Sequence, residues 1–442
     1  MLLEFRCKNF KTFREECVFS MKPTTQRELL YSVLSNEVAG KKIKALCSSV
    51  IYGPNAAGKS NLIGAMDVFK SIVEQGHIRN ISSSFPHLAK ARLELIPNSR
   101  QSKPVPVWFC IEFIAQGMLF RYEISLLLGK FMDRPFARKI ESEILFINEQ
   151  EIFRREETKI HFPTKGISTP LFMPPDPKLQ CKISSNLGGM ELFLTHGFKS
   201  VVSNDLATIV TEWFREKLEI VYVSDMIQCM PPDNAWEGGK IIIPPFLSDA
   251  VKSFGICGSE IIYARRDESD SPEMMSIVNP DEKKMMHVMP VEHYESTGTI
   301  RFINILPLFI KAIISGSVLV MDELDVSLHP SSVISLIKVF HNDEINKKNA
   351  QLIFNTHNPI YLDTDLFRRD EIKLVDRDLE TGESDLYQLS DFGSGPGARK
   401  TNDYMKNYYV GRYGAVRHID FSDVFLSAMK STSDEKKEKT RD

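Results

Sequence analysis

The sequence lacks any C-x-x-C pair, although seven cysteines are scattered over its 442 residues. Cysteines at that close spacing are typical of zinc and redox sites, so we expect neither a zinc site nor a disulfide framework. An odd number of scattered cysteines is instead typical of reduced thiols in a cytosolic chain. The cysteine pattern therefore predicts a cytoplasmic protein.

The sequence also lacks a strong charge bias and a long apolar run. The formal net charge is −3, so no global basic field indicates nucleic-acid binding. This charge does not exclude a local basic patch. The N-terminal stretch "MLLEFRCKNFKTFREECVFS" interleaves charged with apolar residues, and no later run approaches the roughly twenty apolar residues of a membrane span. We expect a soluble protein without a membrane partner, and we find no internal repeat or sustained heptads.

The sequence does have enough apolar content for a large core. It also shows two different patterns of predicted secondary structure. Hydrophobic residues make up 43% of the chain, which suits one large domain or two to three ordinary ones. Residues 105–162 contain successive β-candidates and predict an antiparallel lobe. From Ser296 onward, amphipathic helices alternate with continuous apolar strands, which predicts a parallel sheet covered on both faces.

Several segments interrupt this pattern. Residues 163–189 and 229–245 are rich in proline and glycine and are predicted to be loops, and Pro307 is expected to kink or break its helix. The charged residues 430–442 are predicted to form a disordered tail. We expect four parts: an N-terminal lobe with the antiparallel strands (1–200), an inserted helical and loop region (201–293), a C-terminal lobe with the parallel strands (294–395), and an extension with a charged tail (396–442).

The stretch "IYGPNAAGKSN" has the spacing G-x-x-x-x-G-K-[ST] of a phosphate-binding loop. An apolar strand precedes it and a helical pattern follows, which is the context that the motif requires. The glycines let backbone N–H groups point inward, Lys59 reaches the β- and γ-phosphates, and the Ser60 hydroxyl is a Mg²⁺ ligand. The alternative is a structural turn with a chance lysine. The motif residues are Gly53, Gly58, Lys59 and Ser60.

The stretch "SVLVMDELDVSLHP" supplies the acidic half of such a site. Asp322 follows a short buried strand, at the edge where open α/β sheets place their ligands, and is predicted to hold Mg²⁺. Glu323 is predicted to act as the base for the attacking water. The alternative, a strand ending in surface acids, is less consistent with the phosphate loop upstream.

Two more segments complete the predicted constellation. "ESTGT" places Ser296 and Gly298 at the start of a helix, where a hydroxyl, backbone N–H groups and the helix dipole meet a phosphate. "NTH" ends the next strand, so His357 is predicted to contact the γ-phosphate, against the alternative of a structural histidine.

The order of "KNFKTF", "GPNAAGKSN", "STG", "VLVMDELDVSLHP" and "NTH" resembles the ABC-type ATPase heads of the RecF, SMC and OLD group. The closing "RRDEIKLVDRD" and "YYVGRYGAV" are similar to the AAA-family ATPases of bacterial abortive-infection systems, of the RloA and AbiLi kind. The resemblance covers residues 1–70 and 294–416. It implies an α/β P-loop fold of the ABC-ATPase head type, with ATP and Mg²⁺ as cofactors.

The resemblance further implies two heads packed face to face with ATP between them. It assigns nucleotide binding within one subunit to six residues: Gly53, Asn55, Gly58, Lys59, Ser60 and Asn61. Ser296 and Gly298 would then act on the partner's nucleotide, Asp325 would lie at the dimer contact, and His357 would sense the γ-phosphate. Glu295 and Thr297 depart from the family's usual residues beside the signature serine, and no glutamine is assigned to the loop that bridges the lobes.

The leading functional hypothesis is an ATP-hydrolysing regulator of antiphage defence that acts with a separately encoded effector, in this family often a TOPRIM-type nuclease. DNA or a phage-derived trigger is a further candidate partner. The alternative is a RecF-like repair ATPase that closes on DNA. A transporter subunit fits poorly with the large inserted lobe and the terminal "GRYGAV", and a structural module without activity fits poorly with intact Lys59, Asp322 and Glu323.

Overall fold

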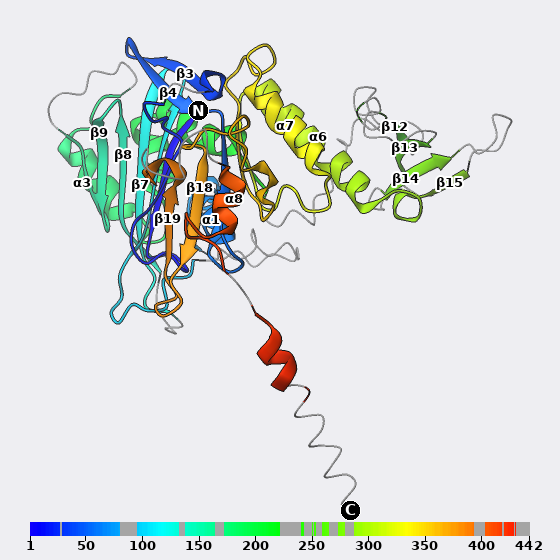
Figure 1. Cartoon of the computed structure of the whole chain (residues 1–442). Coiled ribbons are helices and arrows are strands. Elements are labelled where there is room, and N and C mark those ends of the chain that lie inside the picture. The colour runs from blue at the N-terminus through cyan, green and yellow to red at the C-terminus, as the bar shows by residue number, and fades with distance from the viewer. Residues whose placement is uncertain are drawn as a thin grey trace, which may run out of the picture.

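The structure is a computed structural model that describes residues 1–26, 29–79, 95–131, 138–163, 172–221, 240–242, 250, 252, 259–264, 273–278, 287–392, 403–417, 420–427 and 429. Three of its sheets have four or more strands, and they follow one another across the molecule (Figure 1). The predicted loop at 229–245, apart from 240–242, and the predicted tail at 430–442 lie outside the described residues.

The central sheet has six strands in the order β11-β16-β17-β5-β18-β19. All neighbours are parallel except β18 and β19. β16 and β17 are completely buried, as the continuous apolar strands predict. The bounds are β5 (Ser48–Tyr52), β11 (Leu218–Val221), β16 (Val318–Met321), β17 (Gln351–Asn355), β18 (Ile372–Arg377) and β19 (Ser384–Gln388).

The second sheet has seven antiparallel strands in the order β10-β9-β8-β7-β6-β1-β2, which confirms the predicted antiparallel lobe. The N-terminal strand β1 lies between β2 and β6, so this lobe is built from two separate parts of the chain. The bounds are β1 (Leu2–Lys8), β2 (Cys17–Ser20), β6 (Val107–Ala115), β7 (Met118–Leu127), β8 (Lys139–Ile147), β9 (Gln150–Glu156) and β10 (Lys159–His161). A separate hairpin joins β3 (Val33–Val38) and β4 (Lys41–Leu46).

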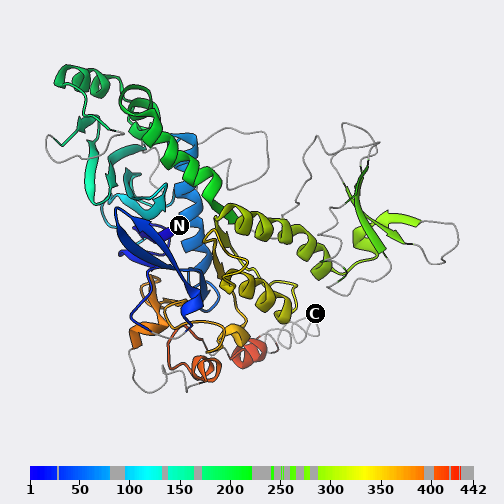
Figure 2. The same ribbon diagram turned by 90° about the horizontal axis from the view of Figure 1, so that it is seen from above.

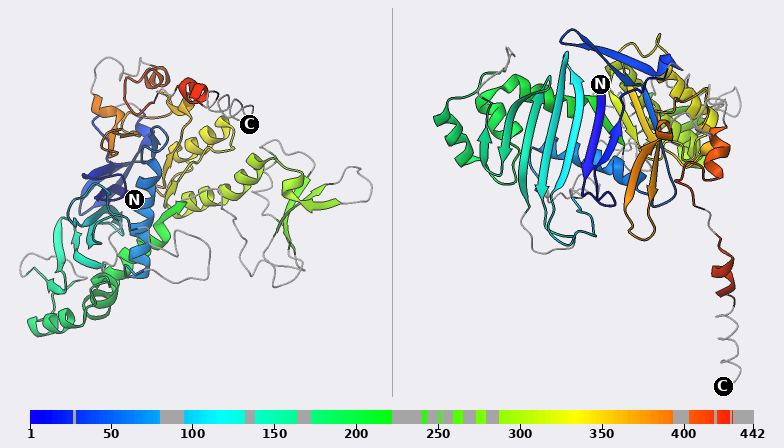
Figure 3. Two further views of the ribbon diagram at one scale, coloured as in Figure 1. Left: turned by 90° about the horizontal axis from the view of Figure 1, so that it is seen from below. Right: turned by 60° about the vertical axis from the view of Figure 1, so that its left-hand side comes forward.

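Helix α1 (Lys59–Gln75) belongs to the core that the two large sheets share. Its Phe69 ring stacks on Phe109 at 5.6 Å and on Tyr122 at 5.8 Å, both in the seven-stranded sheet. On the other face of the central sheet, α7 (Pro330–His341) packs in a second core, and Figures 2 and 3 show the helices against the sheets from further sides. Helix α1 therefore begins at the phosphate loop and is held by both sheets.

Helix α6 (Thr297–Ser315) runs without interruption past Pro307, so this proline does not break the helix, and the predicted alternative of a kink stays a prediction. By length and mean hydropathy, α6 is the one helix in the described ranges that could span a membrane, with a mean hydropathy of 1.5. It nevertheless buries Arg301 and Asn304 and contributes Phe302, Ile305 and Phe309 to the core of the central sheet. A core helix meets the same criteria, so the measure alone is weak evidence for a membrane span.

The regions predicted to be loops contain additional elements. The segment 163–189 includes α3 (Pro177–Asn186), whose N-cap Asp176 accepts hydrogen bonds from two backbone N–H groups. The helical prediction near 206–218 is met by α4 (Asn204–Glu212) and the π-helical turn Trp213–Lys217. Residues 201–293 also contain β11 and a third, antiparallel sheet, β12 (Lys240–Ile242), β13 (Ser259–Ala264), β14 (Glu273–Val278) and β15 (His287–Pro290), so describing this region as helix and loop missed its strands.

This third sheet lies away from the two large sheets, beyond the amino-terminal end of α6 (Figures 1 and 2). Its buried Ile261 and Tyr263 pack with Val291 and Ile303 in a small separate core. At the other end of the chain, α8 (Tyr404–Tyr409) returns to the central sheet, where the Tyr408 ring lies 5.6 Å from that of Tyr52. The terminal motif thus packs beside the strand that leads into the phosphate loop.

Candidate nucleotide site

The phosphate loop joins β5 to α1, as its sequence context predicts. Gly53 and Gly58 have φ values of 156° and 115°, which residues with a Cβ rarely adopt. A Cβ on Gly53 would lie 2.2 Å from the Val375 carbonyl oxygen, and one on Gly58 would lie 2.8 Å from the Ser384 and Thr12 hydroxyls. Both glycines are therefore required by backbone conformation and by close neighbours.

Lys59 is buried in this loop, with 5% of its surface exposed. Its Nζ donates to the carbonyl oxygens of Gly53 at 2.9 Å and Pro54 at 3.1 Å, so the ammonium lies within the curl of the loop. Burial lowers its pKa to about 8, while the nearby charges of Asp322 and Glu323 act in the opposite direction. An anion bound in the loop would stabilise this poorly solvated ammonium.

The acidic pair lies beside the phosphate loop because the carboxyl ends of β16, β17 and β5 are neighbours in the sheet. Asp322 Oδ1 accepts a hydrogen bond from the Ser60 hydroxyl at 3.0 Å. The same oxygen accepts from Asn355 Nδ2, and Asn355 Oδ1 in turn accepts from the backbone N–H of Glu323. The structure thus brings together the two predicted metal ligands and the predicted base.

Asn355 is the residue of this cluster that sequence reasoning left without a role. It is 1% exposed and links the two acids, through the side chain of Asp322 and the backbone of Glu323. Glu323 has a positive φ of 51°, a conformation that a non-glycine residue keeps only when its surroundings hold it. Asn355 is the first residue of the "NTH" motif, so the sequence did single out this position. Its hydrogen bond with Asp322 could not be predicted, because it depends on the order of the strands in the sheet.

Asp325 and His357 lie next to this cluster. Asp325 Oδ2 accepts from the Thr356 hydroxyl at 2.7 Å, and burial raises the pKa of the carboxyl above its usual value. His357 follows Thr356 at the end of β17 and is exposed. Partial desolvation and the charge of Lys59 lower the pKa of the His357 imidazole, so the ring is neutral at neutral pH.

Asn55 and Asn61 occupy different surroundings. Asn55 is exposed at the tip of the loop, whereas Asn61 Nδ2 donates to the Thr12 hydroxyl at 3.0 Å. Thr12 comes from "KNFKTF", and its carbonyl oxygen accepts from the Ser384 N–H at 2.8 Å. Arg377 further supports the loop by donating to the Ala56 carbonyl oxygen at 3.2 Å. These supports from β18, β19 and the N-terminus were not predicted.

Gly298 lies beside Ser327 of its own subunit, and Ser296 precedes it at the start of the same helix. Ser296 is exposed and caps α6, where its Oγ accepts from the Thr299 N–H at 3.2 Å. A Cβ on Gly298 would lie 2.3 Å from the Ser327 carbonyl oxygen, and Arg301 donates to the Glu323 carbonyl oxygen. Gly298 therefore has a structural role within one subunit, and its predicted contact across a dimer stays a prediction.

Substitution of Gly298 with alanine should destabilise the isolated subunit, because the added methyl group meets a backbone oxygen that cannot move freely. We expect a loss of about 1–3 kcal/mol in the free energy of unfolding, the usual cost of overpacking. Gly189→Ala is the matched control, since a Cβ there meets nothing within 4 Å. Urea unfolding of both variants measures the difference, and equal midpoints would show that the Ser327 contact imposes no cost.

The depressed pKa of Lys59 predicts a pH dependence of nucleotide binding. Below pH 8 the ammonium is already charged, whereas above pH 8 the free lysine is neutral and must take up a proton when a phosphate binds. ATP affinity should then fall by up to about tenfold per pH unit above pH 8, until the pKa of the complex is reached.

Calorimetry at pH 9 in buffers of different ionisation enthalpy measures this uptake, with up to one proton per ATP expected. Lys59→Arg is the control, because a guanidinium stays charged throughout this range and should show no uptake. Equal proton uptake by the arginine variant would assign the proton to another group.

A phosphate loop lies next to the acidic residues that follow a buried strand, at one edge of a parallel sheet. This geometry defines the class as a P-loop ATPase of the ABC head type. A family model matches residues 48–196 and 265–363, and its description is "AAA domain, putative AbiEii toxin, Type IV TA system". The matched residues make up more than half of the chain, so the protein belongs to this family. The resemblance to ABC-type heads and to abortive-infection ATPases is thereby confirmed.

Solved structures similar to the chain are heads of SMC proteins. The SMC head domain from Thermotoga maritima is 14% identical, with a TM-score of 0.36 and coverage of 88% of this chain and 98% of that chain. A Pyrococcus furiosus Smc head with an extended coiled coil, bound to the C-terminal domain of ScpA, is 12% identical, with a TM-score of 0.40 and coverage of 93% and 99%. These TM-scores are low, so the fold assignment rests on the sheet order and the family match. No curated protein matches the sequence.

Proposed function

We propose that the protein binds and hydrolyses ATP at the site formed by the phosphate loop, Asp322 and Glu323. The observation that carries this proposal is the connected cluster of Ser60, Asp322, Asn355 and Glu323 beside the buried ammonium of Lys59. In this proposal the loop N–H groups and Lys59 hold the phosphates, and Glu323 accepts the proton of the attacking water. Neutral His357 is suited to orient the γ-phosphate by a hydrogen bond.

The donor set fits a magnesium ion. The Ser60 hydroxyl and an Asp322 carboxylate oxygen lie 3.0 Å apart at the start of α1, and Mg²⁺ prefers hard oxygen ligands shared with phosphates. Mg²⁺ would supply charge neutralisation for the phosphate oxygens when bound. Within the protein, Asn355 restrains the Asp322 carboxylate toward Ser60.

We further propose that ATP is sandwiched between two copies of the chain. Support comes from the exposed signature segment, where Ser296 and Thr297 are accessible at the N-terminal end of a long helix. Such an end can donate backbone hydrogen bonds to a partner's phosphate. The described contacts of Ser296 are with Thr299 of its own helix, so this segment is available to a second subunit.

The biological proposal is a cytoplasmic regulator of abortive infection that controls a separately encoded effector, which we expect to be a TOPRIM-type nuclease. The family supports a toxin–antitoxin or abortive-infection context. A RecF-like ATPase that closes on DNA is the alternative, in which case the dimer would bind DNA directly. DNA or a phage product is the candidate trigger in either case.

A cell-based experiment separates the two functions. The chain is expressed with its neighbouring gene, and phage plating is compared for wild type and for Ser296→Arg, with Lys178→Ala on exposed α3 as control. We expect protection by wild type and the control only, since arginine at the signature blocks closure without touching the phosphate loop. If protection is absent while deletion of the gene sensitises cells to DNA damage, the repair alternative holds.

The same Ser296→Arg protein tests the dimer directly. Its ATP affinity should stay within about twofold of wild type, because the loop of the same subunit supplies most ground-state contacts, while its hydrolysis should fall by at least about 100-fold. Loss of ATP binding as complete as that of a phosphate-loop variant would place Ser296 in its own subunit's site and contradict the sandwich.

A further inference from the structure

A second cluster of chemically active side chains lies at the amino-terminal edge of the central sheet, opposite to the nucleotide site. Cys47 directly precedes β5, Glu371 directly precedes β18, and His341 ends α7. Their exposed fractions are 0%, 0% and 7%. The thiol, the carboxylate and the imidazole offer ligand atoms that all lie within 4.8 Å of one another, and His341 Nε2 lies 3.7 Å from Glu371 Oε1.

We propose that Cys47, His341 and Glu371 bind a zinc ion that ties β5, β18 and α7 together. Thiolate, imidazole and carboxylate are the three ligand types that Zn²⁺ uses in proteins, and ligand atoms within 4.8 Å of one another can converge on a single ion. Cys47 binds as the thiolate, and its proton is released to solvent. C-x-x-C spacing does not detect such a site, because its ligands come from three distant parts of the chain.

Two of the three ligands, Glu371 and His341, have a partner outside the cluster that orients them. The Arg368 backbone N–H donates to Glu371 Oε2 at 2.8 Å, which leaves Oε1 facing His341. The Tyr31 ring lies 5.6 Å from the His341 ring and restrains it from one side. Ordered outer contacts of this kind are characteristic of metal sites because they fix the direction of each ligand.

A fourth polar group lies beside the thiol. The backbone N–H of Cys47 donates to the Ser32 carbonyl oxygen at 2.8 Å. Burial raises the pKa of the Cys47 thiol, and the adjacent Ser32 hydroxyl has a smaller, opposing effect. Ser32 is 0% exposed, yet in the described part of the chain its hydroxyl has no hydrogen-bond partner of good geometry. A buried hydroxyl without a partner is costly, and a metal-bound water or the ion itself would satisfy it.

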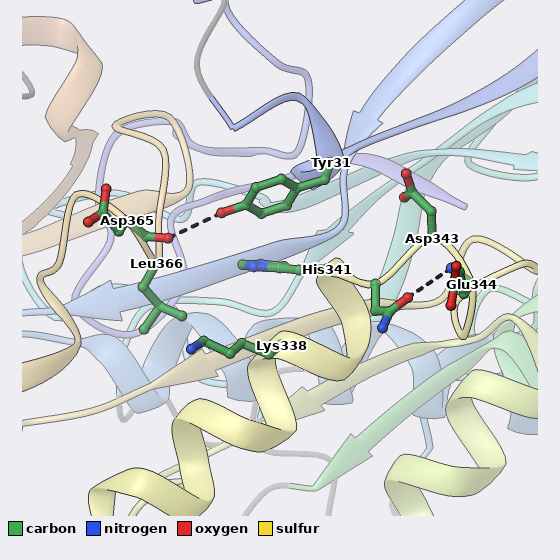
Figure 4. Close-up of a pocket in the computed structure, with 8 residues that line it drawn as sticks. Tyr31, Lys338, His341, Asp343, Glu344, Asp365 and Leu366 are labelled. Atoms are coloured by element: carbon green, nitrogen blue, oxygen red, sulfur yellow. Dashed lines mark hydrogen bonds between the residues drawn. The ribbon is translucent and has the colours of Figure 1, made fainter.

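A cavity provides the entry path. It has a volume of about 610 Å³ and reaches His341 from the surface, with Tyr31 and Lys338 on either side of the ring (Figure 4). Three acidic residues, Asp343, Glu344 and Asp365, also line it and favour cation entry, whereas Lys338 opposes it. Without a metal, Ser48 joins the cluster by donating to Glu371 Oε1 at 2.7 Å and contacting His341 Nε2 at 2.8 Å, so a hydrogen-bond network is the competing arrangement.

Metal analysis of the full-length protein decides between a zinc site and a hydrogen-bond network. The protein is stripped with a chelator, reconstituted with Zn²⁺ and desalted, and we expect one zinc per chain by mass spectrometry of the metal. Cys47→Ser and His341→Gln should each weaken Zn²⁺ binding by at least about tenfold. Cys181→Ser and His161→Gln change exposed residues of the same types and should retain the zinc. Wild-type protein without stoichiometric zinc would establish the hydrogen-bond network instead.

Cobalt substitution keeps the test independent of variant folding. Co²⁺ in the wild-type protein should produce the near-ultraviolet charge-transfer band of a thiolate ligand, and the absence of that band overturns the assignment of Cys47. Asp322→Asn should lose magnesium-dependent ATP hydrolysis but retain the zinc, because the two sites lie at opposite edges of the sheet. Failure of one site is therefore distinguishable from failure of the other.

Discussion

Replacing Lys59 with alanine is expected to reduce ATP hydrolysis at least about 100-fold, the typical cost of removing one charge-stabilising donor from an active site. The ammonium lies within the phosphate loop, where burial weakens competing solvation and strengthens its interaction with a phosphate. ATP affinity should fall as well, because the β- and γ-phosphate charge is left uncompensated. Phosphate release and fluorescent-nucleotide binding measure the two effects separately.

The Lys59→Ala experiment needs a control for surface charge and a control for folding. Lys42→Ala removes an exposed lysine of β4 and should leave both activities unchanged. The alanine variant should also unfold at no lower denaturant concentration than wild type, because it removes a desolvated charge. Turnover at the wild-type rate in Lys59→Ala would show that the loop does not hold the reacting phosphates.

The second large effect is expected for Glu323→Gln, which should bind ATP normally and hydrolyse it about 100- to 10,000-fold more slowly, the usual contribution of a general base. Glutamine retains the shape of the side chain but does not accept the proton of the attacking water. The backbone N–H of Glu323 still donates to Asn355, so the local fold should persist. Single-turnover hydrolysis and ATP binding separate the two predictions.

The stalled Glu323→Gln protein also reports on assembly. If two heads close on ATP, the variant should accumulate as an ATP-bound dimer, visible by light scattering after size-exclusion chromatography. Glu212→Gln changes an exposed residue at the end of α4 and serves as the control, with wild-type turnover and no trapped dimer. A monomer that retains ATP would contradict the sandwich while leaving the base assignment intact.

Local patterns in the sequence were sufficient for the phosphate loop and for most of the elements around it. The strand before Gly53 and the helix after Gly58 lie where the motif requires them. The motif predicts this local structure because glycine at these two positions adopts the positive φ values of the loop without help from distant parts of the chain. The antiparallel lobe was likewise predicted from local patterns, namely successive β-candidates along residues 105–162. The predicted break at Pro307 was wrong because only the folded core shows that α6 is held on both sides of this residue.

Strands within residues 201–293 were missed for a related reason. The buried residues of β13 pack on Val291 and Ile303, which follow them in the chain, so their pattern is only interpretable once that small core is known. Helix α3 was not predicted because it lies in a segment rich in proline and serine. Asp176 and Pro177 form the start of this helix. Aspartate followed by proline was a usable N-terminal signal.

The sequence by itself determined the residues that can cradle a phosphate, the acids that can accompany them and the family to which they belong, because each of these depends on short spacing along the chain. Only the tertiary structure decided which residues meet. The order β16-β17-β5 places Asn355 between Asp322 and Glu323 at one edge of the sheet, and the opposite edge brings together Cys47, His341 and Glu371. Strand order joins positions hundreds of residues apart, and local periodicity contains no information about it.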